Sequence, residues 1–196
     1  MKGNRCDWGD HAEMKQYHDE EWGRPEHDDK KLYEHLMLDV FQAGLNWLMI
    51  MRKRDAFREA FDGFDPAIVA KYGNAKVEKL MRTEGIVRNR AKIEAAIVNA
   101  KALLEVQKEF GSFDKYVWGF VGGKPVHNKW KSLNEIPSST KVAEQMSEDL
   151  KSRGFKFVGP TVVYSFMQAS GIVNDHILGC EQHEAVKAGL KKKAKA

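Results

Sequence analysis

Cysteine and histidine are the side chains of this sequence that are best suited to bind a metal ion. Cys6 and His18 lie near the amino terminus, whereas His176 and Cys180 lie four residues apart near the other end. Two thiolates and two imidazoles form closed tetrahedral zinc sites, and residues four apart share a metal if their segment is helical. Three other histidines are competing candidates: His11, His27 and His183. The spacing alone leaves two interpretations open, a structural zinc site or two buried thiols with ordinary histidines.

A second group of residues predicts a site for a phosphate group. Residues 138–140 offer N-caps for a helix, and Gly154 lies where this helix would end on a left-handed residue. Gly159 and Pro160 then open another helix, since proline loses no hydrogen bond at the first helical position. Free backbone N–H groups and the positive end of the helix dipole would lie there, beside Lys156. The alternative is a helical corner that only packs.

Aromatic residues and one acid form a third group. Flat rings can stack on a base that has been turned out of DNA, although such residues more often belong to a core. Asp39 lies beside apolar positions near the end of a predicted helix. Its carboxylate is therefore either a partly solvated surface group or a buried acceptor that faces a ligand. The aromatic candidates are Trp8, Tyr17, Trp22 and Trp47.

Helices must position these residues. Apolar residues at helical spacing, together with capping residues, predict helices that begin near residues 28, 46, 65, 74, 88, 112, 140 and 160. Residues 1–27 read as irregular, and the stretch from residue 122 to 137 reads as a loop. No alternating pattern is long enough for a strand, so the fold class is all-α.

Composition sets the remaining limits. The chain has 196 residues, 42% of them hydrophobic, and we expect one domain over residues 1–186 with a disordered basic tail over 187–196. A net charge of +4 permits a nucleic-acid partner without requiring one. No secretory signal or membrane span is predicted, so we expect a cytoplasmic protein with reduced thiols and no membrane partner.

Several motifs carry a resemblance to a known family. Over roughly residues 5–180, the chain resembles the 3-methyladenine DNA glycosylase I family of helix-hairpin-helix DNA glycosylases. The stretches that carry it read Phe-Lys-Phe-Val-Gly-Pro-Thr from residue 155, Tyr-Ser-Phe-Met-Gln-Ala from 164, Val-Asn-Asp-His from 173, Tyr-His-Asp-Glu-Glu-Trp-Gly from 17 and Gln-Ala-Gly-Leu-Asn-Trp from 42. The resemblance implies an all-α glycosylase fold, with the helix-hairpin-helix at about 140–171 and one structural zinc ion that joins the two chain ends.

The resemblance also implies roles for single residues. Asp39 would bind the edge of the base between walls formed by Tyr17, Trp47 and Trp8. Zinc would be held by Cys6, His18, His176 and Cys180. The loop with Gly44 and Leu45 would enter DNA near the vacated base, with Leu45 as the wedge, although a lone exposed leucine is otherwise unremarkable. The hairpin would bind the DNA backbone through Lys156, Gly159 and Thr161.

The activity implied is that of a monofunctional DNA glycosylase acting in base excision repair. It would hydrolyse the N-glycosidic bond of flipped-out, cationic N3-alkylated purines, chiefly 3-methyladenine. The partners would be alkylated double-stranded DNA and the free base as product, and the chain would act as a monomer. The alternative is a non-catalytic DNA-binding or lesion-sensing relative whose base pocket has changed.

Five features depart from the family or from its superfamily. Asn174 stands where helix-hairpin-helix glycosylases have a catalytic aspartate, but this family works without that residue. Asp39 replaces a glutamate, Met14 a tyrosine and Asn46 a serine, and the arm between Cys6 and His18 is one residue shorter. We expect the last four changes to lie around the base pocket, where they bear on substrate choice and activity.

Overall fold

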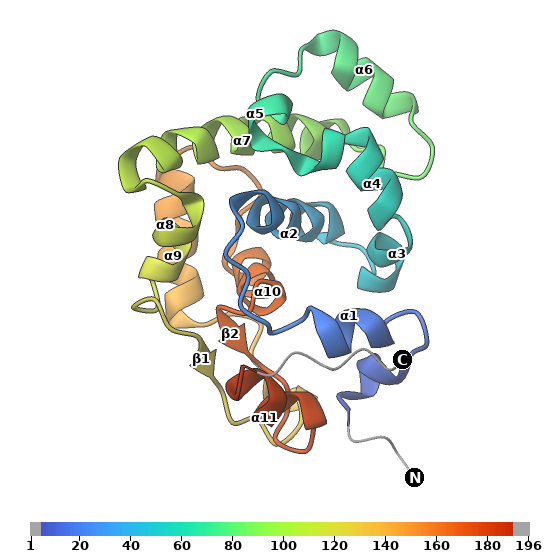
Figure 1. Cartoon of the computed structure of the whole chain (residues 1–196). Coiled ribbons are helices and arrows are strands. Elements are labelled where there is room, and N and C mark those ends of the chain that lie inside the picture. The colour runs from blue at the N-terminus through green and yellow to red at the C-terminus, as the bar shows by residue number, and fades with distance from the viewer. Residues whose placement is uncertain (1–4, 190–196) are drawn as a thin grey trace.

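The computed structural model describes residues 5–189, and nearly all of its regular elements are helices (Figure 1). This agrees with the predicted all-α class. Most of the predicted basic tail, residues 190–196, lies outside the described residues, while Lys187 is the last residue of a helix. Among the described residues, no helix combines the length and the apolar character needed to cross a membrane.

The described elements follow one another along the chain with short connections. In order they are η1 (Asp7–Asp10), α1 (Lys15–Glu20), α2 (Asp29–Gln42), α3 (Trp47–Arg52), α4 (Arg54–Ala60), η2 (Asp62–Phe64), α5 (Pro66–Val69), α6 (Asn74–Arg82), α7 (Arg90–Phe110), α8 (Phe113–Gly119), β1 (Val126–His127), η3 (Leu133–Glu135), α9 (Lys141–Ser152), α10 (Pro160–Ala169), β2 (Val173–Asn174) and α11 (Glu181–Lys187).

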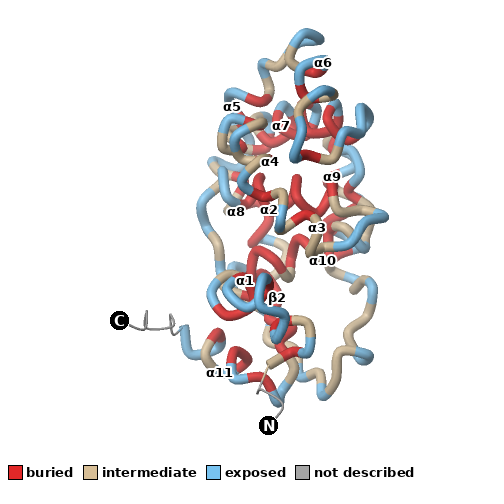
Figure 2. Tube along the Cα trace, turned by 90° about the vertical axis from the view of Figure 1, so that its right-hand side faces the viewer, coloured by how far each residue is buried: buried red, intermediate tan, exposed pale blue. Residues whose placement is uncertain are grey.

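Helix α2 is the centre around which the others pack. Asp28 caps it by accepting a hydrogen bond from the backbone N–H of Lys31. Residues 32–41 are then all buried, so every face of the helix contacts protein. Helix α10 packs against both α2 and α9, and buried residues concentrate in this interior (Figure 2). The central helix can therefore hold a side chain such as Asp39 away from water.

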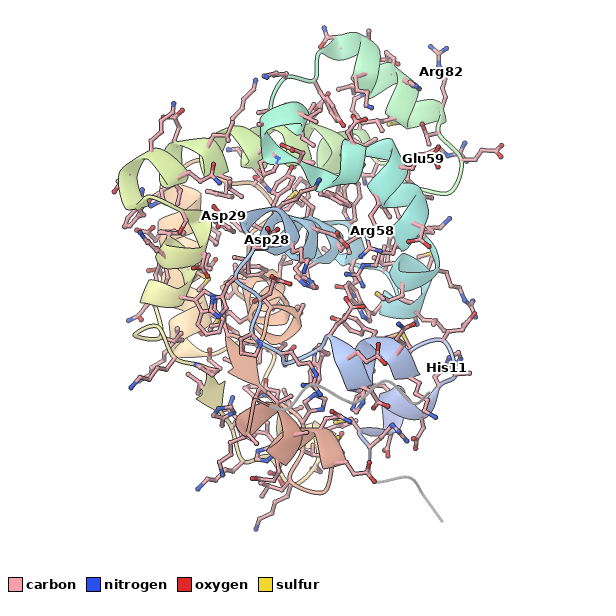
Figure 3. All side chains as sticks on the ribbon, in the orientation of Figure 1. His11, Asp28, Asp29, Arg58, Glu59 and Arg82 are labelled. Carbon is pink, nitrogen blue, oxygen red and sulfur yellow. The ribbon has the colours of Figure 1, made fainter. Side chains whose placement is uncertain are left out.

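Asp29 fixes the start of α2 to a distant part of the chain (Figure 3). Its Oδ2 atom accepts hydrogen bonds from Gln107 Nε2 at 2.6 Å and from the backbone N–H of Phe113 at 2.8 Å. Its Oδ1 atom accepts from the backbone N–H of Asp114 at 2.7 Å. This carboxylate thus joins the beginnings of α2 and α8 to the end of α7.

An ionic network ties the end of α1 to α2 and α4. The buried carboxylate of Glu34 accepts hydrogen bonds from Arg54 Nε at 2.8 Å and from Arg58 Nε at 3.0 Å. Arg54 also donates to Glu21 at 2.6 Å. Hydrogen bonds and charge from Arg58 and Arg54 outweigh the effect of burial and lower the pKa of Glu34. The network holds the amino-terminal segment against the helical core.

The amino-terminal segment is more regular than the sequence indicated, because α1 is a true helix of six residues. No side chain caps its first turn, and the helix is too short to show an apolar stripe. Strands β1 and β2 pair in parallel, with Val126 opposite Val173 and His127 opposite Asn174. Two residues per strand produce no alternation in the sequence, so such a pairing is not predictable from it.

Candidate base pocket and metal centre

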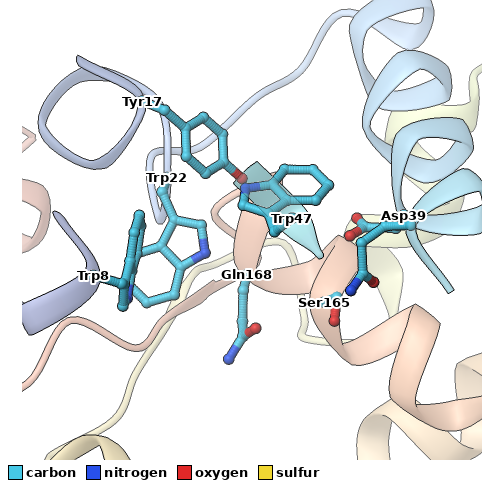
Figure 4. Close-up of a pocket in the computed structure, with 8 residues that line it drawn as sticks. Trp8, Tyr17, Trp22, Asp39, Trp47, Ser165 and Gln168 are labelled. Atoms are coloured by element: carbon cyan, nitrogen blue, oxygen red, sulfur yellow. The ribbon is translucent and has the colours of Figure 1, made fainter. Parts of the chain in front are cut away.

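A hollow of about 210 Å³ lies where the amino-terminal segment meets α2, α3 and α10 (Figure 4). Three of its sides come from segments that are far apart in the sequence. The lining residues are Trp8, Tyr17, Trp22, Asp39, Gln42, Trp47, Ser165 and Gln168. The structure thus brings the predicted acid and the predicted aromatic residues together around one pocket.

Asp39 is the acidic group of this pocket and is only 3% exposed. Its Oδ2 atom is the one fully buried side-chain nitrogen or oxygen among the described residues that has no hydrogen-bond partner. Burial raises the pKa of the carboxyl group well above its ordinary value. Of the two interpretations of Asp39, the structure therefore shows the buried one. An unpaired buried acceptor is costly, and a ligand that donates to it would remove this cost.

Four aromatic rings surround the space next to Asp39. Trp8 and Trp22 meet edge to face with their centroids 4.9 Å apart, and the centroids of Tyr17 and Trp47 are 5.6 Å apart. Burial, and then the charge of Asp39, raises the pKa of the Tyr17 hydroxyl, which therefore stays neutral. The walls are electron-rich and uncharged, a surface to which a flat cation is attracted.

Three polar lining residues were not singled out from the sequence: Gln42, Ser165 and Gln168. Ser165 and Gln168 are three residues apart in α10 and so share one face of that helix. Gln168 Nε2 donates to Asp175 Oδ2 at 2.8 Å, which fixes its side chain. Ser165 and Gln168 both belong to the stretch Tyr-Ser-Phe-Met-Gln-Ala. Which face of α10 lines a pocket depends, however, on how the amino-terminal segment packs against it.

Asn174 does not lie in the pocket. It is fully buried in β2, and its Nδ2 atom donates to the backbone carbonyl of His183 at 3.1 Å. Its Oδ1 atom accepts from the backbone N–H of His176 at 3.3 Å. The amide therefore orders the segment after α10 and is not a group that meets a ligand.

Two of the family departures, Met14 and Asn46, lie next to pocket residues without lining the pocket themselves. Met14 is buried in an apolar cluster with Tyr17 and Trp22, which line the pocket, and with Cys6 and Cys180. Asn46 caps α3 by accepting from the backbone N–H of Leu48. Asp39 lines the pocket itself.

Cys6, His18, His176 and Cys180 form a buried cluster beside the pocket. One ligand atom from each lies within 4.8 Å of the others, although the segment from His176 to Cys180 is a turn and not a helix. The competing histidines lie elsewhere: His11 faces solvent (Figure 3), His27 pairs with Asp114, and His183 bonds Asn128. The four predicted ligands therefore meet across the two ends of the chain.

The distances in this cluster fit a tetrahedral metal ion. Cys180 Sγ lies 3.6 Å from His18 Nε2 and 3.5 Å from His176 Nδ1, and Cys6 Sγ lies 3.8 Å from His176 Nδ1. Sulfur and nitrogen ligands of one zinc ion are about 3.6 Å apart, given its usual bond lengths. Burial lowers the pKa of His176, which favours the neutral imidazole that a metal requires.

Both imidazoles are also oriented from behind. His18 Nδ1 lies 2.9 Å from Asp19 Oδ1, and His176 Nε2 lies 3.0 Å from the backbone carbonyl of Trp22. Arg5 in turn donates to both carboxylate oxygens of Asp19. Partners of this kind fix the ring orientation of metal-binding histidines.

The loop between α2 and α3 lies at the rim of the pocket, because Gln42 and Trp47 on either side of it are lining residues. Gln42 Nε2 donates to the backbone carbonyl of Leu45 at 2.8 Å. The buried Lys92 donates from Nζ to the backbone carbonyls of Phe41 at 2.8 Å and Ala43 at 2.7 Å. Leu45 is 37% exposed, so a rigid loop presents one apolar side chain to solvent.

The turn between α9 and α10 has the predicted backbone. Gly154 has φ +91°, and the N–H of Phe155 bonds the carbonyl of Leu150, which closes α9. Pro160 is the first residue of α10, as predicted. Lys156 and Thr161 are exposed, and Gly159 is partly exposed at the helix start. These residues lie together on one surface turn.

The comparisons with known proteins agree with this geometry. A family model described as methyladenine glycosylase matches residues 8–183. The chain is 46% identical to the DNA-3-methyladenine glycosylase 1 of Escherichia coli K12 over 90% of this chain and 95% of that protein. It is 43% identical to the DNA-3-methyladenine glycosylase of Haemophilus influenzae over 90% and 96%. A solved 3-methyladenine DNA glycosylase I, a tyrosine variant in complex with 3-methyladenine, superposes with a TM-score of 0.89 at 36% identity, over 92% of this chain and 97% of that one.

Proposed function

Because the chain belongs to the methyladenine glycosylase family, we infer that it hydrolyses the N-glycosidic bond of 3-methyladenine in alkylated DNA. The chain is a monofunctional DNA glycosylase, and 3-methyladenine is the base that its curated relatives are named for. This identity favours catalysis over the alternative of a lesion sensor without activity. The observation that carries the assignment of the site is the Oδ2 atom of Asp39, which is buried without a partner inside an aromatic pocket.

The pocket selects a base by its positive charge. Alkylation at N3 makes the purine cationic, and the faces of Tyr17, Trp47 and Trp8 attract such a ring. The carboxylate of Asp39 accepts a hydrogen bond from the base edge and adds an opposite charge. A neutral purine gains neither effect fully, so normal bases are held less well than the alkylated one.

The same positive charge supplies most of the driving force for bond cleavage. A cationic base leaves without being protonated, so the reaction needs no general acid. Asn174 is buried and bonded to backbone groups, so it neither attacks the sugar nor stabilises its developing charge. The protein's contribution is to hold the base outside the helix in the pocket while water completes the reaction.

The rest of the assignment concerns DNA. Residues of about 140–171 act as a helix-hairpin-helix, in which Lys156, Gly159 and Thr161 bind the phosphate backbone of one strand. Gly44 allows the loop after α2 to turn, with φ +78°, and Leu45 fills the space that the extruded base leaves. Neither contact depends on the base sequence of the DNA, as a repair enzyme requires.

We also propose that Cys6, His18, His176 and Cys180 hold one structural zinc ion. The fit of their distances and the partners behind both imidazoles support this assignment. Zinc, when bound, supplies a crosslink between the amino-terminal arm and the segment after α10 and takes no part in the chemistry. We further propose a monomeric, cytoplasmic enzyme whose single domain spans residues 1–186.

One experiment tests the proposed function directly. The purified protein is incubated with a methylated DNA duplex, and the released bases are separated and identified. We expect free 3-methyladenine, and little or no release of the neutral lesions hypoxanthine and 1,N6-ethenoadenine. Efficient release of hypoxanthine, or no release of 3-methyladenine, would contradict the proposal.

A further inference from the structure

The turn between α9 and α10 holds one residue, Phe157, in a backbone conformation that costs free energy. Its φ of +57° lies in the left-handed region, which bulky residues rarely adopt. Its side chain is 46% exposed, so burial does not offset this cost. Phe64 provides the contrast, because it has φ +56° and a fully buried ring. Packing thus explains the strain at Phe64 and leaves that at Phe157 unexplained.

The backbone on both sides of Phe157 is fixed by buried side chains. Asn99 of α7 accepts a hydrogen bond from the N–H of Lys156 at 2.7 Å and donates to the carbonyl of Lys156 at 3.0 Å. Ser147 of α9 donates to the carbonyl of Val158 at 2.6 Å. Asn99 and Ser147 are both fully buried. The backbone that carries the phenyl ring is therefore ordered before any ligand arrives, which lowers the entropy cost of binding.

The ring stands at the edge of a shallow, largely apolar hollow. Ala91, Ala95 and Val98 of α7 line it together with Lys156 and Phe157 of the turn. The remaining lining residue, Glu94, lies 3.8 Å from Arg90 in an ion pair. The exposed α7 residue Val98 extends the apolar surface next to the turn. A ligand with alternating charged and apolar parts would match this surface.

We propose that Phe157 is a DNA-binding residue whose ring packs against a deoxyribose of the strand that the α9–α10 turn holds. This inference rests on the proposed function, which places the phosphates of that strand beside Lys156 and Gly159. Deoxyribose is the apolar part of the backbone between successive phosphates. An apolar contact there adds affinity at any sequence and without a charge, which is what a protein that searches undamaged DNA needs.

The test is to separate this contact from the charged one beside it. Binding of unrelated, undamaged duplexes is measured for Phe157→Gly over about 50 to 200 mM salt. We expect affinity to fall by about three- to tenfold at every salt concentration, from the loss of a partly buried ring. The slope of log affinity against log salt should not change, because no phosphate contact is lost. Lys156→Ala is the matched variant, and its slope should become shallower by about one.

Stability serves as the second readout. Glycine adopts a positive φ readily, so Phe157→Gly should melt at the parent's temperature or above it while binding DNA less well. Phe157→Asn, which also tolerates this region, should behave in the same way. Leu178→Ala removes an equally exposed apolar side chain elsewhere and should leave affinity unchanged.

Two results would overturn the inference: parental affinity in both Phe157 variants, or a shallower salt slope in Phe157→Gly. Release of 3-methyladenine by the parent protein is measured in parallel. A parent that releases no base overturns the proposed function, whereas the binding comparison still decides the role of Phe157.

Discussion

The carboxyl group of Asp39 is held in the base pocket at a cost to the fold. Its Oδ2 atom is buried without a partner, and burial raises its pKa. A cationic base restores what the fold lacks, since it offers both a donor and a positive charge. Asp39 is therefore a residue at which stability and activity are expected to oppose each other.

For activity, we expect Asp39→Asn to lower kcat/KM on methylated duplex by about ten- to hundredfold, the effect of losing a charge-assisted hydrogen bond. Asp39→Glu restores the residue that the family has at this position and should release 3-methyladenine at least as fast as the parent. The check is single-turnover release of the base. An Asp39→Asn protein as active as the parent would remove Asp39 from the mechanism.

For stability, we expect the opposite ranking. The folded pKa of Asp39 lies above the unfolded one because burial disfavours the charged form. The stabilisation this gives is complete below the unfolded pKa and is lost as pH rises through the folded pKa. Asp39→Asn removes the charge and should be more stable than the parent near neutral pH, by about 1–3 kcal/mol.

The free energy of unfolding of both proteins is measured with denaturant between about pH 4 and pH 8. The difference in favour of Asp39→Asn should grow as pH rises. A variant that is less stable than the parent at the upper end would show that the carboxylate has a partner in solution.

At the residue scale, the sequence offered Asp39 and the aromatic residues only as candidates, and the family resemblance supplied their roles. The sequence did not predict Gln42, Ser165 and Gln168. Uncharged polar residues at helical spacing resemble any solvent-facing stripe, and their role depends on which face of α10 the arm leaves open. Phe157 was also missed, because the residue type phenylalanine gives no indication that the backbone there has a positive φ.

Among the elements, the loop between α2 and α3 depends on one buried lysine. Lys92 lies in the first turn of α7, where the helix dipole disfavours a cation, and burial lowers its pKa. Its two hydrogen bonds to the carbonyls of Phe41 and Ala43 offset this cost and fix the backbone before Leu45. Lys92 thus acts as a positioning residue for the proposed wedge.

We expect Lys92→Met to lower base release from duplex DNA by more than about tenfold, because the wedge loop loses its support and two carbonyls lose their donor, at a cost of about 1–3 kcal/mol. Binding of free 3-methyladenine should change little, since the pocket itself keeps its lining. Lys101→Met, an exposed lysine of the same helix, is the matched control. Equal losses in duplex cleavage and free-base binding would indicate general damage to the fold.

Helix boundaries were the most predictable feature of the elements. Asn46, Asp65, Ser112 and Thr140 each cap the helix that the sequence placed after them, because a capping side chain acts locally. The helix expected after residue 46 is instead divided at Lys53 into α3 and α4. Tertiary contacts determine where such a helix is divided, and the local sequence does not predict them.

Over the whole molecule, the cluster of Cys6, His18, His176 and Cys180 joins the two ends of the described chain. We expect purified protein to contain about one zinc ion per chain, and Cys180→Ala or His18→Ala to lose it with a clear fall in melting temperature. Metal analysis and thermal unfolding check this, with the exposed His11→Ala as control. Full zinc content in either ligand variant would disprove the site. Any loss of base release should follow the fraction of unfolded protein, since the ion takes no part in the chemistry.

The sequence could supply these four ligands as candidates but could not bring them together. Cys6 and His176 are 170 positions apart in the chain. They meet where the segment after α1 bonds the end of α10, through the N–H of Gly23 to the carbonyl of Gln168 at 2.9 Å. The family resemblance selected among the histidines where spacing did not, and the described coordinates place the selected ones in one cluster.

The position of that cluster has a consequence for how the protein is made in the cell. Ribosomes extend a chain by about 5 to 20 residues per second, so roughly 10 to 30 seconds pass between the emergence of Cys6 and that of His176. Throughout that interval Trp8 and Tyr17 have neither α10 nor the carboxy-terminal ligands to pack against. Helices α2 to α8 emerge early, but the surface that recognises damage is completed only after α10 and the carboxy-terminal ligands have followed. An interrupted chain would thus be left without a base pocket, even where most of its helices have folded.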